Sequence, residues 1–164
     1  MSKAVLNSSV IIALSTLGYL DKLKYVFTEI LIPRAVHDEV CVRGHGLTGE
    51  RDLLEAVKEG IITVKDVKTR LLVNALLDPI ALGEAETITL TVEEKADYIV
   101  MDDKLARRRA KSMGLNVVGT LRVLRLMYDA RLIDKNQLLK ALEKLKETGF
   151  RISDQVVNKA VRKI

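Results

Sequence analysis

Tryptophan is absent from this sequence of 164 residues, and cysteine, histidine, proline and phenylalanine are rare. The single Cys41 excludes an internal disulfide bond, and between Val40 and Val42 it is typical of a small buried apolar side chain. Aromatic residues make up only 4% of the chain, which argues against binding of nucleic-acid bases on aromatic platforms. A lone thiol fits a reducing compartment, so we expect a cytoplasmic protein.

Three further kinds of site or segment find no support in the sequence. His37 and His45 are isolated histidines, for which structural or surface roles are favoured over zinc ligation. The glycines do not form a Walker-type phosphate loop, which also needs a following Lys and Ser or Thr. No run reaches the roughly 18 apolar residues of a membrane span, so we expect no membrane association and assign Val10 to Leu14 to the core.

Length and composition predict one domain covering residues 1–164. The chain is long enough for one hydrophobic core and too short for two ordinary domains, and 48% of its residues are hydrophobic. Its net charge is +5, with 30% charged residues. Binding to a nucleic-acid backbone is therefore favoured over binding to its bases.

Short β-rich runs alternate with helical periods, which predicts an α/β fold with a parallel sheet. The predicted strands are residues 4–6, 29–32, 61–64, 98–101 and 116–118. Helices are expected over residues 35–42, over residues 52–58 before Gly60, and after Pro79. Beyond Thr120 the pattern is helical only, and Leu138, Leu142 and Leu145 are spaced for one buried face.

Polar side chains follow two of the predicted strands. Asn7 follows the first strand and precedes a helix that Ser8 or Ser9 can cap, and Asp102 and Asp103 follow the fourth strand. In an open parallel sheet, ligands bind outside the carboxyl ends of the strands. These side chains are therefore candidates for a single site.

Further acidic residues suggest that such a site would take a divalent metal ion. Glu39 lies in the predicted helix 35–42, and Glu84 lies near the start of the helix after Pro79. Mg²⁺ and Mn²⁺ prefer oxygen ligands, commonly one or two carboxylates with water and phosphate oxygens. Repulsion among clustered carboxylates raises the pKa of at least one of them when no metal is bound. Such an ion can activate water and offset charge on a phosphodiester.

Five segments resemble, in their order and spacing, the motifs of PIN-domain proteins, and the resemblance runs from about residue 3 to the C-terminus. The segments are Leu6-Asn7-Ser8-Ser9, residues 32–40, Gly83-Glu84-Ala85-Glu86, residues 101–107 and Val118-Gly119-Thr120-Leu121. They are most similar to an uncharacterised prokaryotic branch with predicted nucleic-acid binding, related to the toxin ribonucleases. The resemblance implies a three-layer α/β/α fold with about five parallel strands and a helical C-terminal tail.

The resemblance also implies a function and roles for single residues. The function is endoribonuclease activity on RNA with Mg²⁺ or Mn²⁺, with the toxin of a toxin and antitoxin pair as one setting for it. Glu39, Glu84 and Asp102 would hold the metal, with Asp103 as an alternate fourth carboxylate. Asn7 and Thr120 would position water or phosphate. Many PIN nucleases have an aspartate where this chain has Asn7, so the different-class alternative is a catalytically weak or inactive binding module.

Each candidate residue also has a structural interpretation. Asn7 and Ser8 are common at turns and helix caps, and Asp102 or Asp103 can cap the helix that begins near Lys104. Thr120 can cap the following helix. Glu39 can be a surface residue beside Asp38, and a first-turn Glu84 is favourable wherever it points.

Basic residues crowd the helix after Asp102 and are candidates for phosphate contacts, together with Ser8: Lys104, Arg107, Arg108, Arg109 and Lys111. Arg122, Arg125 and Arg131 extend this candidate positive surface. The alternative is a solvated helix face. The segment from Leu121 to Tyr128 has more apolar positions than one helix face needs, so we expect a homodimer.

Overall fold

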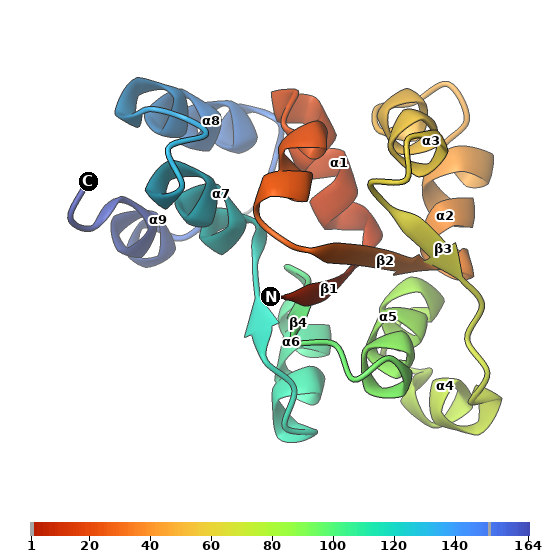
Figure 1. Ribbon diagram of the computed structural model, residues 1–164. Helices are drawn as coiled ribbons and strands as arrows, with labels where there is room; N and C mark the ends of the chain where they lie inside the picture. Colours follow the sequence, from red (N-terminus) through yellow and green to blue (C-terminus); the bar gives the residue numbers. More distant parts are fainter. Residues whose placement is uncertain (1, 151) are drawn as a thin grey trace.

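Five parallel strands form one sheet in the computed structural model, which describes residues 2–150 and 152–164. The strands are β1 (Lys3–Leu6), β2 (Glu29–Pro33), β3 (Thr63–Lys65), β4 (Tyr98–Val100) and β5 (Val117–Val118). Their order is β3-β2-β1-β4-β5, so β1 lies at the centre (Figure 1). Val5 pairs with Leu31 on one side and Ile99 on the other.

Helices connect successive strands and cover both faces of the sheet (Figure 1). They are α1 (Ser8–Leu17), the 3-10 helix η1 (Leu20–Tyr25), α2 (Arg34–Asp38), the π-helix η2 (Glu39–Arg43), α3 (Glu50–Lys58), α4 (Arg70–Leu76), α5 (Leu82–Glu93), α6 (Lys104–Ser112), α7 (Thr120–Asp129), α8 (Lys135–Glu147) and α9 (Asp154–Val161). None of the described helices is long and apolar enough to cross a membrane.

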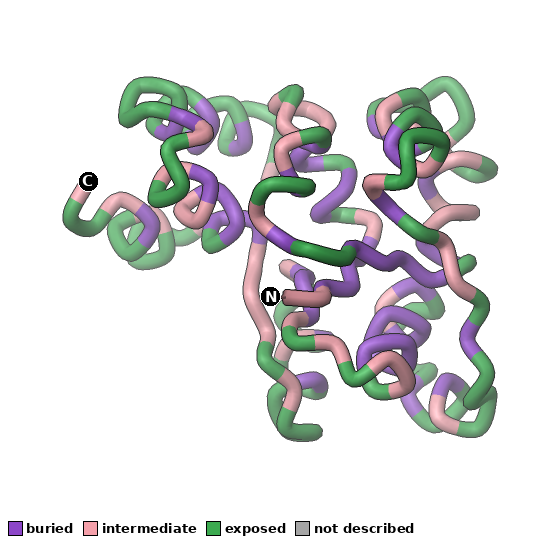
Figure 2. Tube along the Cα trace, viewed as in Figure 1, coloured by how far each residue is buried: buried purple, intermediate pink, exposed green. Residues whose placement is uncertain are grey.

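The sheet is buried on both faces because successive side chains of its strands feed two separate cores. Ala4 and Leu6 of β1 pack into the core formed with α1, α3, α7 and α8, whereas Val5 packs into the core formed with α4, α5 and α6. All three side chains are fully buried, and Figure 2 shows the central strands in the buried colour. This arrangement confirms the predicted α/β/α fold with a parallel sheet.

The helical tail closes one of these cores. Leu138, Leu142 and Leu145 of α8 are buried, as predicted from their spacing, and so are Val123 and Leu124 of α7. Figure 1 shows α7 between α8 and α9, on the same side of the sheet as α1. The apolar surplus of the tail is therefore used inside the chain, and it no longer supports the expected homodimer.

Several predicted elements differ from the structure at their boundaries, among them the third strand and the helix after the second strand. The strand expected at residues 61–64 begins only at Thr63, because the backbone N–H groups of Ile61 and Ile62 donate to the Ala56 carbonyl at the end of α3. The helix expected over residues 35–42 ends as α-helix at Asp38 and continues as the π-helix η2. Helices α4 and η1 were not predicted.

Two predicted caps are corrected by the structure. Asn7, rather than Ser8 or Ser9, is the N-cap of α1, because its side chain accepts the hydrogen bond from Val10 N. Gly119 is the N-cap residue of α7, and Thr120 is the first residue of that helix. The hydroxyl of Thr120 is thereby free to make a different contact, described below.

Candidate active site at the carboxyl ends of the strands

The candidate residues gather at one edge of the sheet because the strands that precede them are parallel neighbours. Asn7 follows β1, Asp102 and Asp103 follow β4, and Thr120 follows β5. The backbone N–H of Asn7 donates to the Val100 carbonyl at 3.2 Å, which extends the pairing of β1 and β4 up to the site. The first turn of α5, which carries Glu84, faces this edge through its contact with Glu39.

Asn7 is almost fully buried, with 1% of its surface exposed. Its Oδ1 accepts from Val10 N at 3.3 Å and from the Ser9 hydroxyl at 3.1 Å. These two bonds fix which way the amide points, since only an oxygen can accept both. The Nδ2 group is buried without a partner among the described residues. Asn7 therefore offers the site a hydrogen-bond donor, where a carboxylate would offer lone pairs.

Glu39, the first residue of η2, lies directly over the first turn of α5. The Ser8 hydroxyl donates to Glu39 Oε2 at 2.6 Å. A Cβ atom at Gly83 would stand 1.9 Å from Glu39 Oε1, so no side chain fits at position 83 while Glu39 keeps this place. Sequence reasoning overlooked this role of Gly83, although a glycine in a helix is a signal for close approach.

Glu84 is half-buried, and its pKa is raised from the usual value chiefly by that burial. A hydrogen bond from its own backbone N–H opposes the shift, and the negative charges of Glu39 and Asp103 add to it. None of the ion pairs among the described residues involves these three carboxylates. The structure thus places Glu84 within electrostatic reach of two further carboxylates, and none of the three has an ion pair among the described residues.

Asp102 is held by the start of α7. Its Oδ1 accepts from Thr120 N at 2.8 Å, and its Oδ2 accepts from the Thr120 hydroxyl at 2.6 Å. Burial raises the pKa of Asp102, while the Thr120 hydrogen bonds and the nearby Arg107 lower it. Gly119 makes this contact possible, because a Cβ there would lie 3.0 Å from both Asp102 Oδ1 and Arg107.

Asp103 is the N-cap of α6, and its Oδ2 accepts from Ala106 N at 2.8 Å. One of the two aspartates after β4 thus caps the helix, as the structural interpretation anticipated. The same Asp103 is the one that raises the pKa of Glu84, while Asp102 is held by Thr120. Of the two, Asp103 is therefore the closer electrostatic neighbour of Glu84.

Comparisons with known proteins agree with the predicted family. A family model described as a PIN domain matches residues 3–164. This chain belongs to the PIN-domain family. No curated protein matches it.

Two solved structures share features of this PIN domain at low identity. One is a domain of a functionally unknown protein from Methanocaldococcus jannaschii DSM 2661, with 19% identity over 73% of this chain and 91% of the other, and a TM-score of 0.48. The other is a PilT N-terminus domain protein from the hyperthermophilic archaeon Sulfolobus solfataricus P2, with 18% identity over 86% of this chain and 94% of the other, and a TM-score of 0.45.

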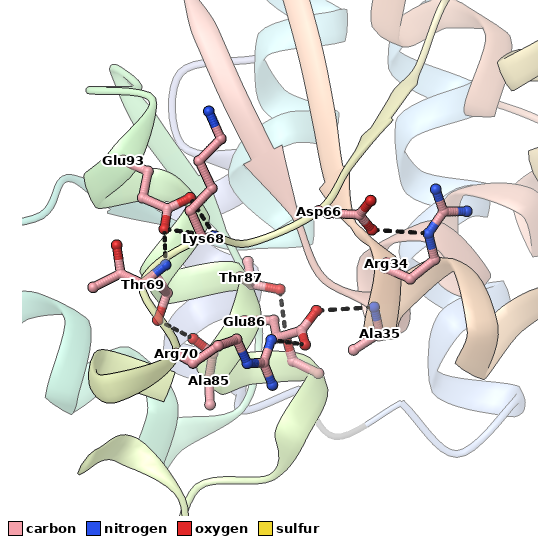
Figure 3. Close-up of polar contacts among 12 residues, drawn as sticks. Arg34, Ala35, Asp66, Lys68, Thr69, Arg70, Ala85, Glu86, Thr87 and Glu93 are labelled. Carbon is pink, nitrogen blue, oxygen red and sulfur yellow. Dashed lines mark hydrogen bonds and ion pairs between the residues drawn. The ribbon is translucent and has the colours of Figure 1, made fainter. Parts of the chain in front are cut away.

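Other acidic residues of the PIN domain have structural roles, as Figure 3 shows. Glu86 Oε1 accepts from Ala35 N at 3.0 Å, and Glu86 Oε2 pairs with Arg70 at 2.9 Å. Glu93 accepts from the backbone N–H groups of Lys68 and Thr69. Because Ala35 lies in the first turn of α2, Glu86 ties that helix to α5 and so helps to place Glu39 against Gly83.

The basic residues of α6 do not share one surface. Arg107 donates to the Met101 carbonyl at 2.8 Å and lies beside Asp102. Arg108 and Arg109 line a different cavity with Pro79 and Ile80. Lys104 is exposed at the start of the helix. The basic residues that are candidates for phosphate contacts are therefore divided between two sides of α6.

PIN domains generally use divalent metal ions, and the acidic set of this chain fits a hydrated ion of that kind. Among the described residues, no three acidic, histidine or cysteine side chains are placed to share one ion directly. Mg²⁺ keeps several water ligands and commonly uses only one or two carboxylates. A hydrated cation beside Glu84 would relieve the repulsion from Glu39 and Asp103 that raises its pKa.

Proposed function

We propose that this PIN domain is a divalent-metal-dependent endoribonuclease that hydrolyses RNA phosphodiester bonds. The observation that carries the proposal is the set of Glu39, Glu84 and Asp103. Glu84 is half-buried, the charges of the other two carboxylates add to the rise in its pKa that burial causes, and none of the three has an ion pair among the described residues. Folding stability alone does not explain such a set, because electrostatic repulsion between carboxylates costs free energy. Glu86, the other partly or fully buried glutamate of the same motif, is neutralised by Arg70.

Each residue of the site has a distinct task in this proposal. Glu84, Glu39 and Asp103 would hold a hydrated Mg²⁺ or Mn²⁺ ion, in part through its water ligands, and Asp102 would add an oxygen on the side of Thr120. When bound, the ion supplies activation of a water molecule and neutralises charge on the phosphodiester. Ser8 orients Glu39 through its 2.6 Å hydrogen bond. The free N–H of Asn7 would donate to a phosphate oxygen.

The substrate and setting are parts of the same proposal. RNA, single-stranded or structured, suits a chain of net charge +5 with basic residues beside the acidic set. A role as the toxin of a toxin and antitoxin pair, neutralised by an antitoxin protein in the cytoplasm, would follow from the ribonuclease activity.

A second candidate function is nucleic-acid binding without efficient cleavage, and Asn7 favours it. The oxygen of this side chain is already used by Val10 N and Ser9, so the unpartnered atom is a nitrogen donor that cannot ligate a metal. A site with this donor in place of a first carboxylate would bind metal weakly and phosphate well.

Cleavage of a labelled single-stranded RNA in Mn²⁺ separates the two functions. The wild-type chain should cleave it, Glu84→Gln should lower the rate by about a hundredfold or more, and Glu55→Gln on the exposed face of α3 is the matched control. RNA binding with no cleavage at any Mn²⁺ or Mg²⁺ concentration would establish the binding module. Equal cleavage by wild type and Glu84→Gln would remove the metal-site proposal.

The Asn7→Asp variant tests the departure from the family pattern. One carboxylate oxygen can keep the bonds to Val10 N and Ser9, and the other takes the place of the free N–H. We therefore expect tighter Mn²⁺ binding by calorimetric titration and faster cleavage than in the wild type. Unchanged or weaker Mn²⁺ binding would show that position 7 does not contribute to the metal site.

A further inference from the structure

A separate cavity of about 550 Å³ lies beside the acidic set, between α6, β5, α7 and the C-terminal segment that contains α9. Asp102 lines it, so the cavity borders the candidate active site. Val117 and Val118 of β5, the edge strand of the sheet, also line it. Figure 1 shows α9 beside α7, and the two helices are in contact.

The charge around this cavity is strongly positive. Among the described residues, five cationic side chains line it, against the one carboxylate of Asp102: Arg107, Lys111, Arg122, Arg125 and Lys159. Asp102 is already held by Thr120. Arg125 is paired with Asp129 at 2.9 Å.

Three of these cations are available to a ligand. The side chains of Lys111, Arg122 and Lys159 make no hydrogen bond or ion pair with the described residues, and all three residues are exposed. They come from three different helices, α6, α7 and α9, which the fold brings to one hollow. Their mutual repulsion is not offset inside the chain, so an anion that binds between them gains from all three.

The remaining wall of the cavity is apolar. Phe150, Ile152 and Val156 line it from the C-terminal segment, and Leu121 from α7. A ligand that fills both the cationic part and the apolar part of the cavity needs a multiply charged anion joined to a flat apolar group. A nucleotide has this construction, whereas an acidic peptide supplies carboxylates without the ring.

We propose that this cavity binds one nucleotide unit, with its phosphate on Lys111, Arg122 and Lys159 and its base or sugar against the apolar wall. The proposal rests on the proposed function, because it assigns the unit to the RNA strand next to the bond that is cleaved at the acidic set. Asp102 is the residue shared by both sites, and Arg107, which also lines the cavity, lies beside it.

Binding of a short fluorescent single-stranded RNA, measured by anisotropy with EDTA present to prevent cleavage, tests the proposal. Lys111→Gln with Arg122→Gln should weaken binding about tenfold and reduce the salt slope by roughly 0.7 for each phosphate that is no longer neutralised. The matched control is Arg108→Gln with Arg109→Gln, which removes the same charge from the other cavity beside α6. It should change the affinity less than about twofold.

A second pair of variants tests the cavity without changing charge. Val156→Trp fills the apolar wall from an exposed position and should also weaken RNA binding. Leu139→Trp, at a similarly exposed position on α8, should not. Competition with uridine monophosphate distinguishes the source of the nucleotide. If the free nucleotide displaces the RNA when the two are present at equal concentration, the cavity is assigned to free nucleotides.

Each outcome decides the proposal. Equal weakening by both charge pairs would overturn it, since RNA binding would then follow net charge alone. Wild-type RNA cleavage combined with no effect of either cavity variant would overturn the cavity and leave the ribonuclease intact. Absence of RNA binding and cleavage in the wild type, with binding of an acidic peptide that Lys111→Gln with Arg122→Gln removes, would overturn both proposals in favour of a protein partner.

Discussion

At the scale of single residues, the site depends on small differences between similar side chains. Glu84 and Glu86 stand two positions apart on α5, but Glu86 is paired with Arg70 and Glu84 has two acidic neighbours. Asp102 and Asp103 are adjacent, but Thr120 holds the first and the N-terminus of α6 holds the second. The chemistry of each side chain is set by its contacts and not by its type.

Glu84→Gln should stabilise the metal-free protein at neutral pH. The folded state raises the pKa of Glu84 above the ordinary value of 4.5, which applies to the unfolded chain. Between the pKa of the unfolded chain and the higher pKa of the folded chain, the folded chain therefore binds more protons. Stability therefore falls as pH rises through this window, and glutamine removes the loss. Thermal unfolding in EDTA should show a higher Tm for the variant at pH 7 and no difference below pH 4.

Added Mn²⁺ should reverse this order at pH 7, because only the wild-type carboxylate gains from a cation. Glu55→Gln, which removes an exposed charge from α3, should show neither effect. A variant Tm that equals the wild-type Tm in EDTA at every pH would mean that Glu84 carries no repulsion in the folded state.

Gly83→Ala should separate function from folding. The new Cβ would occupy the place of Glu39 Oε1, and a flexible carboxylate can move away at little cost. Alanine is also the better helix residue by roughly 1 kcal/mol. We expect unchanged or slightly higher stability in urea unfolding, with Mn²⁺ binding weakened by about tenfold because Glu39 leaves its position.

The opposite pattern, with lower stability and unchanged Mn²⁺ affinity, would contradict this assignment of Glu39. Gly60→Ala is not a suitable control, because Gly60 has a positive φ of 78° that strains any side chain. Leu139→Ala on the exposed face of α8 provides the comparison for a small exposed change.

At the scale of elements, helix α5 organises the site. Its first turn carries Gly83 and Glu84, and its next residues include Glu86, which accepts from the backbone N–H of Ala35 in α2. The sequence predicted that a helix would follow Pro79. It did not predict that Glu84 would belong to the candidate site while Glu86, two positions later, would have a structural role. The tertiary contact between α2 and α5 makes that distinction.

Glu86→Ala should destabilise the fold by about 2 kcal/mol or more, since it leaves a buried N–H and an arginine without their partner. Glu84→Ala should not, because Glu84 has no ion pair to lose. Urea unfolding of the two variants under the same conditions makes the comparison. A smaller loss for Glu86→Ala than for Glu84→Ala would show that Glu86 does not anchor α2.

At the scale of the whole molecule, homodimer formation stays a prediction with a changed basis. The apolar face of α7 is buried inside the chain, so it is not free for a partner. Exposed apolar side chains remain on and between the contacting elements η2 and α3, namely Val42, Leu47 and Leu54. These are the better candidates for an interface, because apolar surface of this kind gains most from being covered.

Light scattering at micromolar concentration should therefore give twice the mass of one chain. Leu54→Arg should shift the mass toward the monomer, whereas Leu139→Arg on the tail helix α8 should leave it unchanged. The two positions have similar exposed fractions, 48% and 41%. A monomer mass for the wild type at every accessible concentration would refute the dimer.

The sequence by itself determined the order of the elements and the edge at which the site lies. Apolar runs such as Ala4 to Leu6 and Tyr98 to Val100 are too short and too β-rich to form helices, and helical periods separate them. Parallel pairing then brings the residues after each strand to one edge. Asn7, Asp102 and Asp103 could be placed there from local pattern alone, whereas the site role of Thr120 came from the resemblance to PIN-domain proteins.

Only the tertiary structure decided what each of these residues contacts. Helix caps, ion pairs and close approaches depend on atoms from segments far apart in sequence, such as Glu39 against Gly83 or Glu86 against Ala35. A one-dimensional pattern contains no information on these distances. The same reason explains why neighbouring arginines of α6 separate, with Arg107 beside Asp102 and Arg108 in another cavity: consecutive residues of a helix point in different directions, and the packing of neighbouring elements determines what each one meets.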